Sequence, residues 1–322
     1  MRVIKKTKNS SLAGVYIAES DSGKLVEFVE STQPPFTREE KWVLVISTLY
    51  GCPVECKFCD AGGNYKGKIS YDDLLFQVDY LIREFYPDLN VPCKKFKIQF
   101  ARMGEPSFNP NVLQVLEDLP HLYNIPGFIP SLSTIAPRGT NSFFNRLLEI
   151  KKTKYPLSFQ LQFSIHSTDK TQRDQIIPVR KWDFNEMARY GRQFFDPGGR
   201  KITLNFALST VSIIDPNVLI RHFDPDIFII KLTPLNPTYK VAANKLQTLI
   251  TPEHSDYDII DQLKSKGYEV ILSVGEWEEN LIGSNCGQYV QSVQIKGLQP
   301  EDSYCYPLMD FFTFAPSRDR RE

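Results

Sequence analysis

The chain has 322 residues, of which 42% are hydrophobic and 12% aromatic, so it can bury a sizeable core and is not a disordered protein. Its 38 lysines and arginines balance 38 aspartates and glutamates, which argues against a globally basic nucleic-acid binder and leaves only a local patch for RNA. No apolar run is long enough to span a membrane, and the N-terminus lacks the apolar segment of a signal peptide. We therefore expect a cytoplasmic protein with reduced thiols.

The first predicted elements are a β-hairpin, a strand and a helix. The hairpin covers residues 14–31 and turns at the sequence DSG. The strand, at 42–48, is short and apolar and ends just before a group of cysteines. The helix covers 70–86, where apolar residues recur at helical spacing behind an N-capping serine.

Strand-like and helical runs alternate through the rest of the chain. The predicted strands are 96–101, 130–135, 158–165, 202–209, 226–232 and 269–274, and the predicted helices are 109–123, 141–152, 184–195 and 255–267. Such repeated units predict an α/β fold with a parallel sheet, closed or partly closed. We expect three parts: an N-terminal hairpin element (1–38), a main domain (39–292) and a C-terminal extension (293–322).

Three cysteines stand within eight positions, at Cys52, Cys56 and Cys59. A structural zinc site normally has four ligands in two separated pairs, and no second pair or HxxxH sequence follows. A disulfide framework is typical of short secreted chains. An open iron–sulfur cluster fits better, because three thiolates can hold three irons of a [4Fe–4S] cube and leave the fourth iron free.

Several polar residues follow the predicted strands, where the active sites of barrel enzymes lie. They are Gly104 and Glu105 after the strand at 96–101, Ser133 in the strand at 130–135, Ser164, Ile165 and His166 at the end of the strand at 158–165, and Asn236 after the strand at 226–232. Each alone has a plain structural explanation, such as a surface carboxylate or a turn-forming asparagine. Together, above a cysteine loop, they predict a binding site.

The C-x3-C-x2-C spacing is that of radical S-adenosylmethionine (SAM) enzymes. Together with "RMGEPSFN", "SLST", "FSIHSTDKTQRDQIIPV", "TPLNPT" and "NCGQYV", in this order, it resembles the RlmN/Cfr family of radical SAM RNA methyltransferases over about residues 15–292. The resemblance implies a partial (β/α)6 TIM-like barrel that methylates adenine C2 or C8 in ribosomal or transfer RNA. It also implies two cofactors, a [4Fe–4S] cluster and SAM, and an electron donor such as flavodoxin or ferredoxin. We expect a monomer that does not associate with membranes.

The family pattern also implies residue roles. Cys52, Cys56 and Cys59 would hold the cluster, whose free iron SAM chelates before an electron cleaves it to a 5′-deoxyadenosyl radical. Cys286, in "NCGQ", would carry a methyl group from one SAM and present it to the radical made from a second. The positions matching the SAM site are Phe58, Gly104, Glu105, Ser133, Ser164, Ile165, His166 and Asn236.

The chain departs from the family at the residues of product release. Val45 stands where the family has a second cysteine that resolves the methylated sulfur, and Ala13 aligns with a proton-accepting glutamate. The family's small N-terminal helical domain is also missing from this sequence. Three hypotheses follow: an RNA methyltransferase with altered release chemistry, a radical SAM enzyme acting on a non-RNA substrate without standard methyl transfer, or an inactive cluster protein that binds a partner.

Overall fold

The structure is a computed structural model that describes residues 1–251, 253–285, 289–294, 305–306 and 309–310. Its main feature is one mixed sheet of eleven described strands, in the order β12-β11-β10-β9-β8-β7-β4-β3-β2-β1-β13. A separate two-stranded sheet pairs β5 (Leu49–Cys52) with β6 (Gly63–Lys68).

The parallel part of the sheet starts at β4 and runs to β12. Its strands are β4 (Trp42–Ile46), β7 (Phe96–Phe100), β8 (Phe128–Thr134), β9 (Gln160–Ser164), β10 (Ile202–Leu208), β11 (Phe228–Pro234) and β12 (Val270–Leu272). Within the described residues no pairing joins the two edges, so the barrel is open. The predicted α/β fold with a partial barrel is confirmed, and β12 is the strand predicted at 269–274, so the parallel part has seven described strands where the family resemblance implied six.

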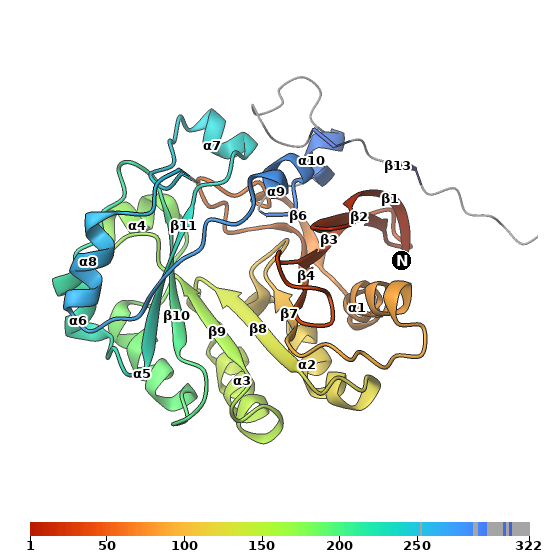
Figure 1. The fold of residues 1–322 in the computed structure, drawn as a ribbon, viewed down its shortest axis with the longest axis horizontal. Helices are drawn as coiled ribbons and strands as arrows, with labels where there is room; N and C mark the ends of the chain where they lie inside the picture. The colour runs from red at the N-terminus through yellow and green to blue at the C-terminus, as the bar shows by residue number, and fades with distance from the viewer. Residues whose placement is uncertain (252, 286–288, 295–304, 307–308, 311–322) are drawn as a thin grey trace, which may run out of the picture.

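Most of the helices lie around the outside of the parallel strands, and the last two described helices contact the N-terminal strands instead (Figure 1). In chain order they are α1 (Tyr71–Phe85), the 3-10 helix η1 (Pro106–Phe108), α2 (Asn111–Leu122), α3 (Asn141–Lys154), α4 (Lys170–Ile176), α5 (Phe184–Phe194), α6 (Pro216–His222), α7 (Tyr239–Ala243), α8 (Asp258–Ser265), α9 (Trp277–Ile282) and α10 (Tyr289–Gln294). The predicted cap of α1 is present, since Ser70 Oγ accepts a hydrogen bond from Asp73 N at 3.1 Å. None of the described helices is both long and apolar enough to cross a membrane.

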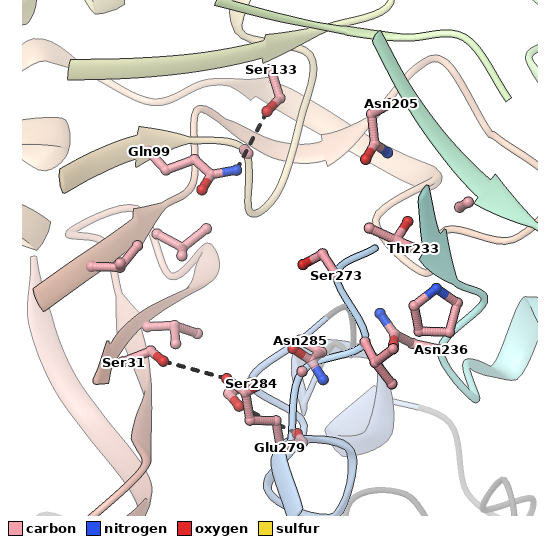
Figure 2. Close-up of a pocket in the computed structure, with 18 of the residues that line it drawn as sticks. Ser31, Gln99, Ser133, Asn205, Thr233, Asn236, Ser273, Glu279, Ser284 and Asn285 are labelled. Carbon is pink, nitrogen blue, oxygen red and sulfur yellow. Dashed lines mark hydrogen bonds between the residues drawn. The ribbon is translucent and has the colours of Figure 1, made fainter. Parts of the chain in front are cut away.

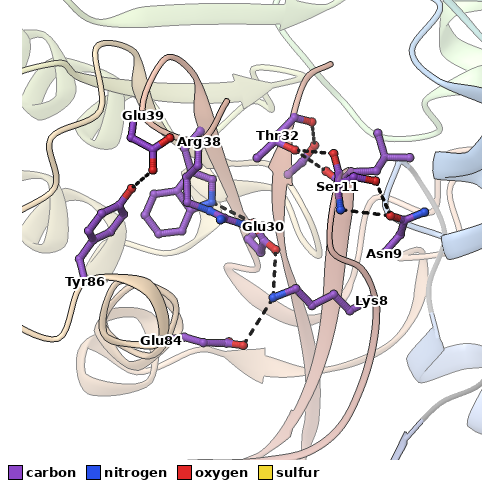
Figure 3. Close-up of polar contacts among 12 residues, drawn as sticks. Lys8, Asn9, Ser11, Glu30, Thr32, Arg38, Glu39, Glu84 and Tyr86 are labelled. Carbon is purple, nitrogen blue, oxygen red and sulfur yellow. Dashed lines mark hydrogen bonds and ion pairs between the residues drawn. The ribbon is translucent and has the colours of Figure 1, made fainter. Parts of the chain in front are cut away.

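The N-terminal strands extend the parallel sheet as an antiparallel meander. The predicted hairpin is confirmed as β2 (Ala13–Glu19) and β3 (Leu25–Thr32), while β1 (Arg2–Asn9) and β13 (Met309–Asp310) are additional strands. Glu30 of β3 joins the meander to β4, because its carboxylate accepts a 3.0 Å hydrogen bond from Trp42 Nε1 and lies 3.2 Å from Arg38 Nη2 and 3.9 Å from Lys8 Nζ (Figure 3). β3 then pairs antiparallel with β4.

The two faces of the parallel strands differ in polarity. Residues that point outward are apolar and fully buried under the helices, as Trp42, Leu44 and Ile46 illustrate on β4. Residues at the alternate positions are largely polar, and many of them line a cavity on the concave side. Since strands of a covered parallel sheet are normally apolar on both faces, the polar inner face marks a binding chamber in place of a packed barrel interior.

Candidate functional site

The segment that carries the cysteines leaves the sheet after β4 and is fixed at both ends by one side chain. Asn109 is fully buried, and its Nδ2 donates 2.8 Å hydrogen bonds to the carbonyls of Thr48 and Ile69. These two carbonyls flank β5 and β6, so a single amide closes the base of the loop. Asn109 belongs to the quoted "RMGEPSFN" run, which gives that run a structural role at the cysteine loop.

Tight backbone turns fold the cysteine loop back on itself. Gly51 has φ +74°, and a Cβ there would lie 2.6 Å from the carbonyl oxygens of Gly63 and Asn64. A Cβ on Gly62 would lie 2.7 Å from Cα of Glu55, which itself has φ +59°. The glycines that bound the cysteines are therefore required by close backbone approach.

The loop is also clamped to the segment that follows β11. Thr238 Oγ1 donates to the Phe58 carbonyl at 2.9 Å, and Asn244 Nδ2 donates to the Lys57 carbonyl at 2.7 Å. The Asp60 carboxylate accepts from the backbone N–H groups of Tyr239 and Lys240, both at 2.9 Å. The cysteine loop and the start of α7 thus form one unit.

The three cysteines pack with one small apolar group formed by Val54, Ala61, Ile135 and Ile177. Burial raises the pKa of the Cys52 thiol to about 11 and that of Cys56 to about 12, the latter also because Cys52 lies beside it. Lys240 acts in the opposite direction on Cys56. Thiols with a raised pKa lose their protons when they bind metal.

The donor set fits an open iron–sulfur cluster better than a single metal ion. Among the described residues, no three His, Cys, Asp or Glu side chains converge closely enough to hold one ion. A [4Fe–4S] cube spreads its thiolates over separate irons, and a sulfur-only set of three is the donor chemistry that it takes. The chain's own Lys240 would offset part of the negative charge of such a centre.

A cavity of about 410 Å³ opens on the concave side of the sheet, beside the cysteine loop. Phe58 and Cys59 line it from the loop, and Ser133, Ser164, His166 and Asn236 line it from the strand ends, so six sequence-predicted site residues share one chamber. Figure 2 shows its polar wall, including Ser133, Asn205, Thr233, Asn236 and Ser273. Its size lies in the range of small-molecule and cofactor pockets.

His166 presents one defined hydrogen-bonding atom to the cavity. Its Nδ1 accepts a 3.0 Å hydrogen bond from Ala207 N, and burial together with the Arg173 charge lowers its pKa to about 3. The ring is therefore neutral, with its proton on Nε2. The His166 ring meets the Phe58 ring edge to face, with 4.7 Å between the ring centroids. The His166 backbone has a φ of +64°, which is uncommon for a residue other than glycine.

Three of the predicted binding residues lie behind the cavity wall. The Glu105 carboxylate is buried and accepts hydrogen bonds from Ser107 Oγ at 2.7 Å, Thr134 Oγ1 at 2.5 Å and Ile135 N at 2.9 Å. Gly104 (φ +98°) passes so close to Leu49 that a Cβ would lie 2.5 Å from it. Ile165 is fully buried. In this structure these residues shape the wall and join it to the cysteine loop.

A buried ion pair, which the sequence analysis did not single out, binds backbone groups of residues that precede and follow Cys286 in the sequence. Arg102 donates from Nε to Glu27 at 2.8 Å and from its Nη atoms to the carbonyls of Gly283 and Ser284 at 2.6 and 2.8 Å. Glu27 also accepts from Val290 N at 3.1 Å. Cys286 lies outside the described residues, but the residues on either side of it are tied to this one pair.

The two positions of the predicted release chemistry differ in setting. Val45 lines the cavity, so a cysteine at that position would have faced it. Ala13, at the start of β2, is buried opposite Ser31 and is not among the lining residues. The two carboxylates among the described lining residues are instead Glu276 and Glu279, and burial raises the pKa of Glu279.

Sequence reasoning also missed the polar inner face of the strands. Gln99, Gln162, Asn205, Lys231 and Thr233 all line the cavity. The sequence does contain a pattern that indicates this face. The polar residues alternate with apolar ones in strands that otherwise look fully buried, as in "FKIQF" and "QLQFS". Glu279 had no such signal, since its place depends on how α9 returns to the cavity.

The chain resembles known proteins in sequence and in fold. No family model matches the chain. It is 29% identical over 277 residues to a protein of Desulfitobacterium hafniense, covering 83% of this chain and 72% of that one, and 24% identical over 275 residues to a protein of Trichormus variabilis, covering 81% and 71%. Both carry the name "Probable dual-specificity RNA methyltransferase RlmN".

The fold is shared with a solved structure. A radical SAM methyltransferase from Sphaerobacter thermophilus superposes with a TM-score of 0.61 at 18% identity, covering 85% of this chain and 76% of that one. The resemblance predicted from the motifs is thereby confirmed, and the chain is a homologue of the RlmN proteins built on the fold of a radical SAM methyltransferase.

Proposed function

We propose that the protein is a radical SAM enzyme that holds a [4Fe–4S] cluster on Cys52, Cys56 and Cys59 and modifies RNA by methyl transfer. The observation that carries the proposal is the anchoring of all three cysteines on one loop at the edge of a polar cavity. When bound, the cluster supplies the electron that cleaves the sulfonium of SAM. The names of the RlmN relatives supply RNA as the substrate.

The cavity residues nearest the loop suit a bound SAM molecule. Phe58 offers a ring for its adenine, held by the edge contact to His166 and by the Thr238 bond to the Phe58 carbonyl. The neutral His166 donates from Nε2, and Ser133, Ser164 and Asn236 offer further hydrogen-bonding groups. Glu105 and Gly104 act indirectly, by fixing the wall behind these donors.

Glu279 is the proposed acid–base group. It lines the cavity beside Ser284 and Asn285, it accepts a 3.3 Å hydrogen bond from Ser31 Oγ (Figure 2), and burial raises its pKa, the direction that suits a carboxyl in proton transfer. This position makes it a substitute for the family's glutamate, which the motif alignment replaces by Ala13. Cys286, next in sequence to Asn285, is the proposed methyl carrier.

A second candidate function is a radical SAM reaction on a non-RNA small molecule. The observation that favours it is Val45, which lines the cavity at the position of the family's release cysteine and cannot form the disulfide that frees the product. An enzyme that does not release a methylated base has no need for that cysteine. The two functions share the cluster and SAM and differ in substrate and product.

One anaerobic experiment tests the shared chemistry and then separates the two candidates. The cluster-loaded protein is incubated with SAM and a reductant, with and without ribosomal RNA. We expect 5′-deoxyadenosine in both cases, one added methylene on the Cys286 peptide, and methylated adenine when RNA is present. Deoxyadenosine without the Cys286 modification supports the second function, and its absence contradicts both.

The matched control uses the chain's other cysteines. Cys56→Ala removes one proposed cluster ligand, whereas Cys93→Ala removes a buried thiol that precedes β7, far along the chain from the cysteine loop. Iron content and deoxyadenosine formation should disappear in the first variant and persist in the second. Equal loss in both variants would contradict the ligand assignment.

A further inference from the structure

Two lysines occupy the inner face of the parallel sheet. Lys97 on β7 and Lys231 on β11 alternate with fully buried apolar residues that face the outer helices. Lys231 lines the cavity, as does Val43 of β4, and Val43 is the register partner of Lys97. Both lysines therefore lie on the inner face of the sheet, Lys97 near the start of β7 and Lys231 in the middle of β11.

Neither lysine has a counter-ion within the described part of the chain. By contrast, the two lysines that are buried within the described residues are paired: Lys151 with Asp196, and Lys181 with Asp174 at 2.6 Å. No described carboxylate or hydrogen-bond acceptor lies at bonding distance from Lys97 Nζ or Lys231 Nζ.

The charges that do influence the two lysines are positive. Burial, then Lys231, Arg200 and Lys41, lower the pKa of Lys97 to about 7, and burial and Lys41 lower that of Lys231. Lys41, which is half-buried, stands just before β4, and the exposed Arg200 stands just before β10. Placing partly buried like charges near one another without an anion is unfavourable.

The surrounding wall adds donors and no negative charge. Gln99 and Gln162 line the cavity above, and the Nε2 atoms of both donate to Ser133 Oγ, at 3.4 and 3.1 Å. Along β4 and β7 to β12, the described inward positions hold neutral or basic residues only. The two lining carboxylates, Glu276 and Glu279, lie on or beside α9, after the last parallel strand.

We propose that Lys97 and Lys231 bind a phosphate group on the inner face of the parallel sheet. A phosphate monoester carries roughly two negative charges near neutral pH, which matches two or more ammonium groups better than a single carboxylate does. Assigning the phosphate to the substrate rests on the proposed function, whereas the existence of the site does not. The lysines would hold the phosphate of a small phosphorylated molecule, or the phosphate of one nucleotide in an RNA strand.

The test is calorimetric titration of inorganic phosphate into the full-length, cluster-loaded protein at low ionic strength. We expect one phosphate per chain in the wild type and a loss of affinity of about tenfold or more in Lys97→Met and in Lys231→Met. Lys94→Met, an exposed lysine three positions before Lys97, should bind as the wild type does. Equal phosphate affinity in all four proteins would overturn the proposal.

Thermal unfolding distinguishes a variant that has lost the phosphate site from a variant that does not fold. Because each methionine removes an unpaired, partly buried charge, Lys97→Met and Lys231→Met should melt at or above the wild-type temperature without phosphate. Added phosphate should raise the melting temperature of the wild type and not that of the variants. Variants that melt well below the wild type, with phosphate still stabilising them, would show that the lysines act in packing and would refute the site.

Separate titrations identify the source of the phosphate and the main competitor. Ribose 5-phosphate and a short single-stranded RNA distinguish a small molecule from a nucleotide, and either one is supported by competition with inorganic phosphate. SAM also carries a carboxylate, so SAM affinity is measured in the same variants. If the variants lose SAM affinity and keep phosphate affinity, the lysines serve SAM and the proposal fails. Phosphate binding without any SAM cleavage would leave the site intact and refute the proposed function instead.

Discussion

Arg102 and Glu27 form a buried ion pair in which the Arg102 Nε donates to the Glu27 carboxylate at 2.8 Å. The pair joins β3 of the N-terminal meander to the loop after β7, and both partners also bind backbone groups on either side of Cys286. Burial raises the pKa of Glu27 and the Arg102 charge opposes that rise. The pair is thus a single anchor for three distant segments.

Breaking this pair should be costly. Removing one partner of a buried ion pair typically costs about 3–5 kcal/mol, because the other charge stays buried and unpaired. We therefore expect Arg102→Met to lower the free energy of unfolding by about that amount in urea titrations. The double variant Glu27→Leu, Arg102→Met should recover part of the loss. A single variant as stable as the wild type would show that the pair does not anchor the fold.

Asn109 should control retention of the cluster. In Asn109→Asp the side chain keeps its shape but places a carboxylate against the Thr48 and Ile69 carbonyls in place of two 2.8 Å hydrogen bonds. We expect the variant to fold but to lose iron faster than the wild type during anaerobic gel filtration. Asn90→Asp, at an exposed position, is the control. Equal iron loss in both variants would mean that the loop needs no such closure.

The His166 ring should stay neutral throughout the physiological range. Its pKa of about 3 lies below the unfolded value of 6.5, so the unfolded chain binds more protons between these values. The contribution of His166 to stability is therefore present above the unfolded pKa and is lost as pH falls toward about 3. Nitrogen-15 NMR of the ring should show the Nε2–H tautomer without titration between about pH 5 and 8. A ring that titrates in that interval would contradict the Ala207 hydrogen bond.

Glu279→Gln should separate SAM cleavage from product formation. A general base is commonly worth about 10²- to 10⁴-fold in rate, so methylated product should fall by that factor while 5′-deoxyadenosine formation persists. Glu276→Gln removes the other lining carboxylate and serves as the matched control, with product yield close to the wild type. Unchanged product yield in Glu279→Gln would exclude this residue as the acid–base group.

The sequence predicted much of the fold and the loop chemistry because both depend on local patterns. Every strand predicted between 42–48 and 269–274 is present within a few residues, and so are the helices over 70–86 and 184–195. The cysteine spacing likewise needs no tertiary context. What local patterns predicted less well was the orientation of single side chains: Glu105 follows a strand as expected, yet its carboxylate turns into the wall.

Long-range pairings could not be predicted from the sequence. Arg102 and Glu27 are 75 residues apart, and Asn109 bonds to carbonyls 61 and 40 residues before it. Nothing in the local sequence of either partner indicates these contacts, because they arise only when separate strands are placed next to one another. Lys97 and Lys231 likewise come to lie on one inner face only because β7 and β11 belong to the same sheet.

The claim on which the account rests is that Cys52, Cys56 and Cys59 hold an iron–sulfur cube with one iron open to SAM. The most direct measurement is electron paramagnetic resonance of the anaerobically purified, dithionite-reduced protein before and after SAM is added, together with iron and sulfide analysis. We expect about four irons per chain and a spectrum that changes when SAM binds. Zinc in place of iron, or a cluster spectrum unchanged by SAM, would contradict the account.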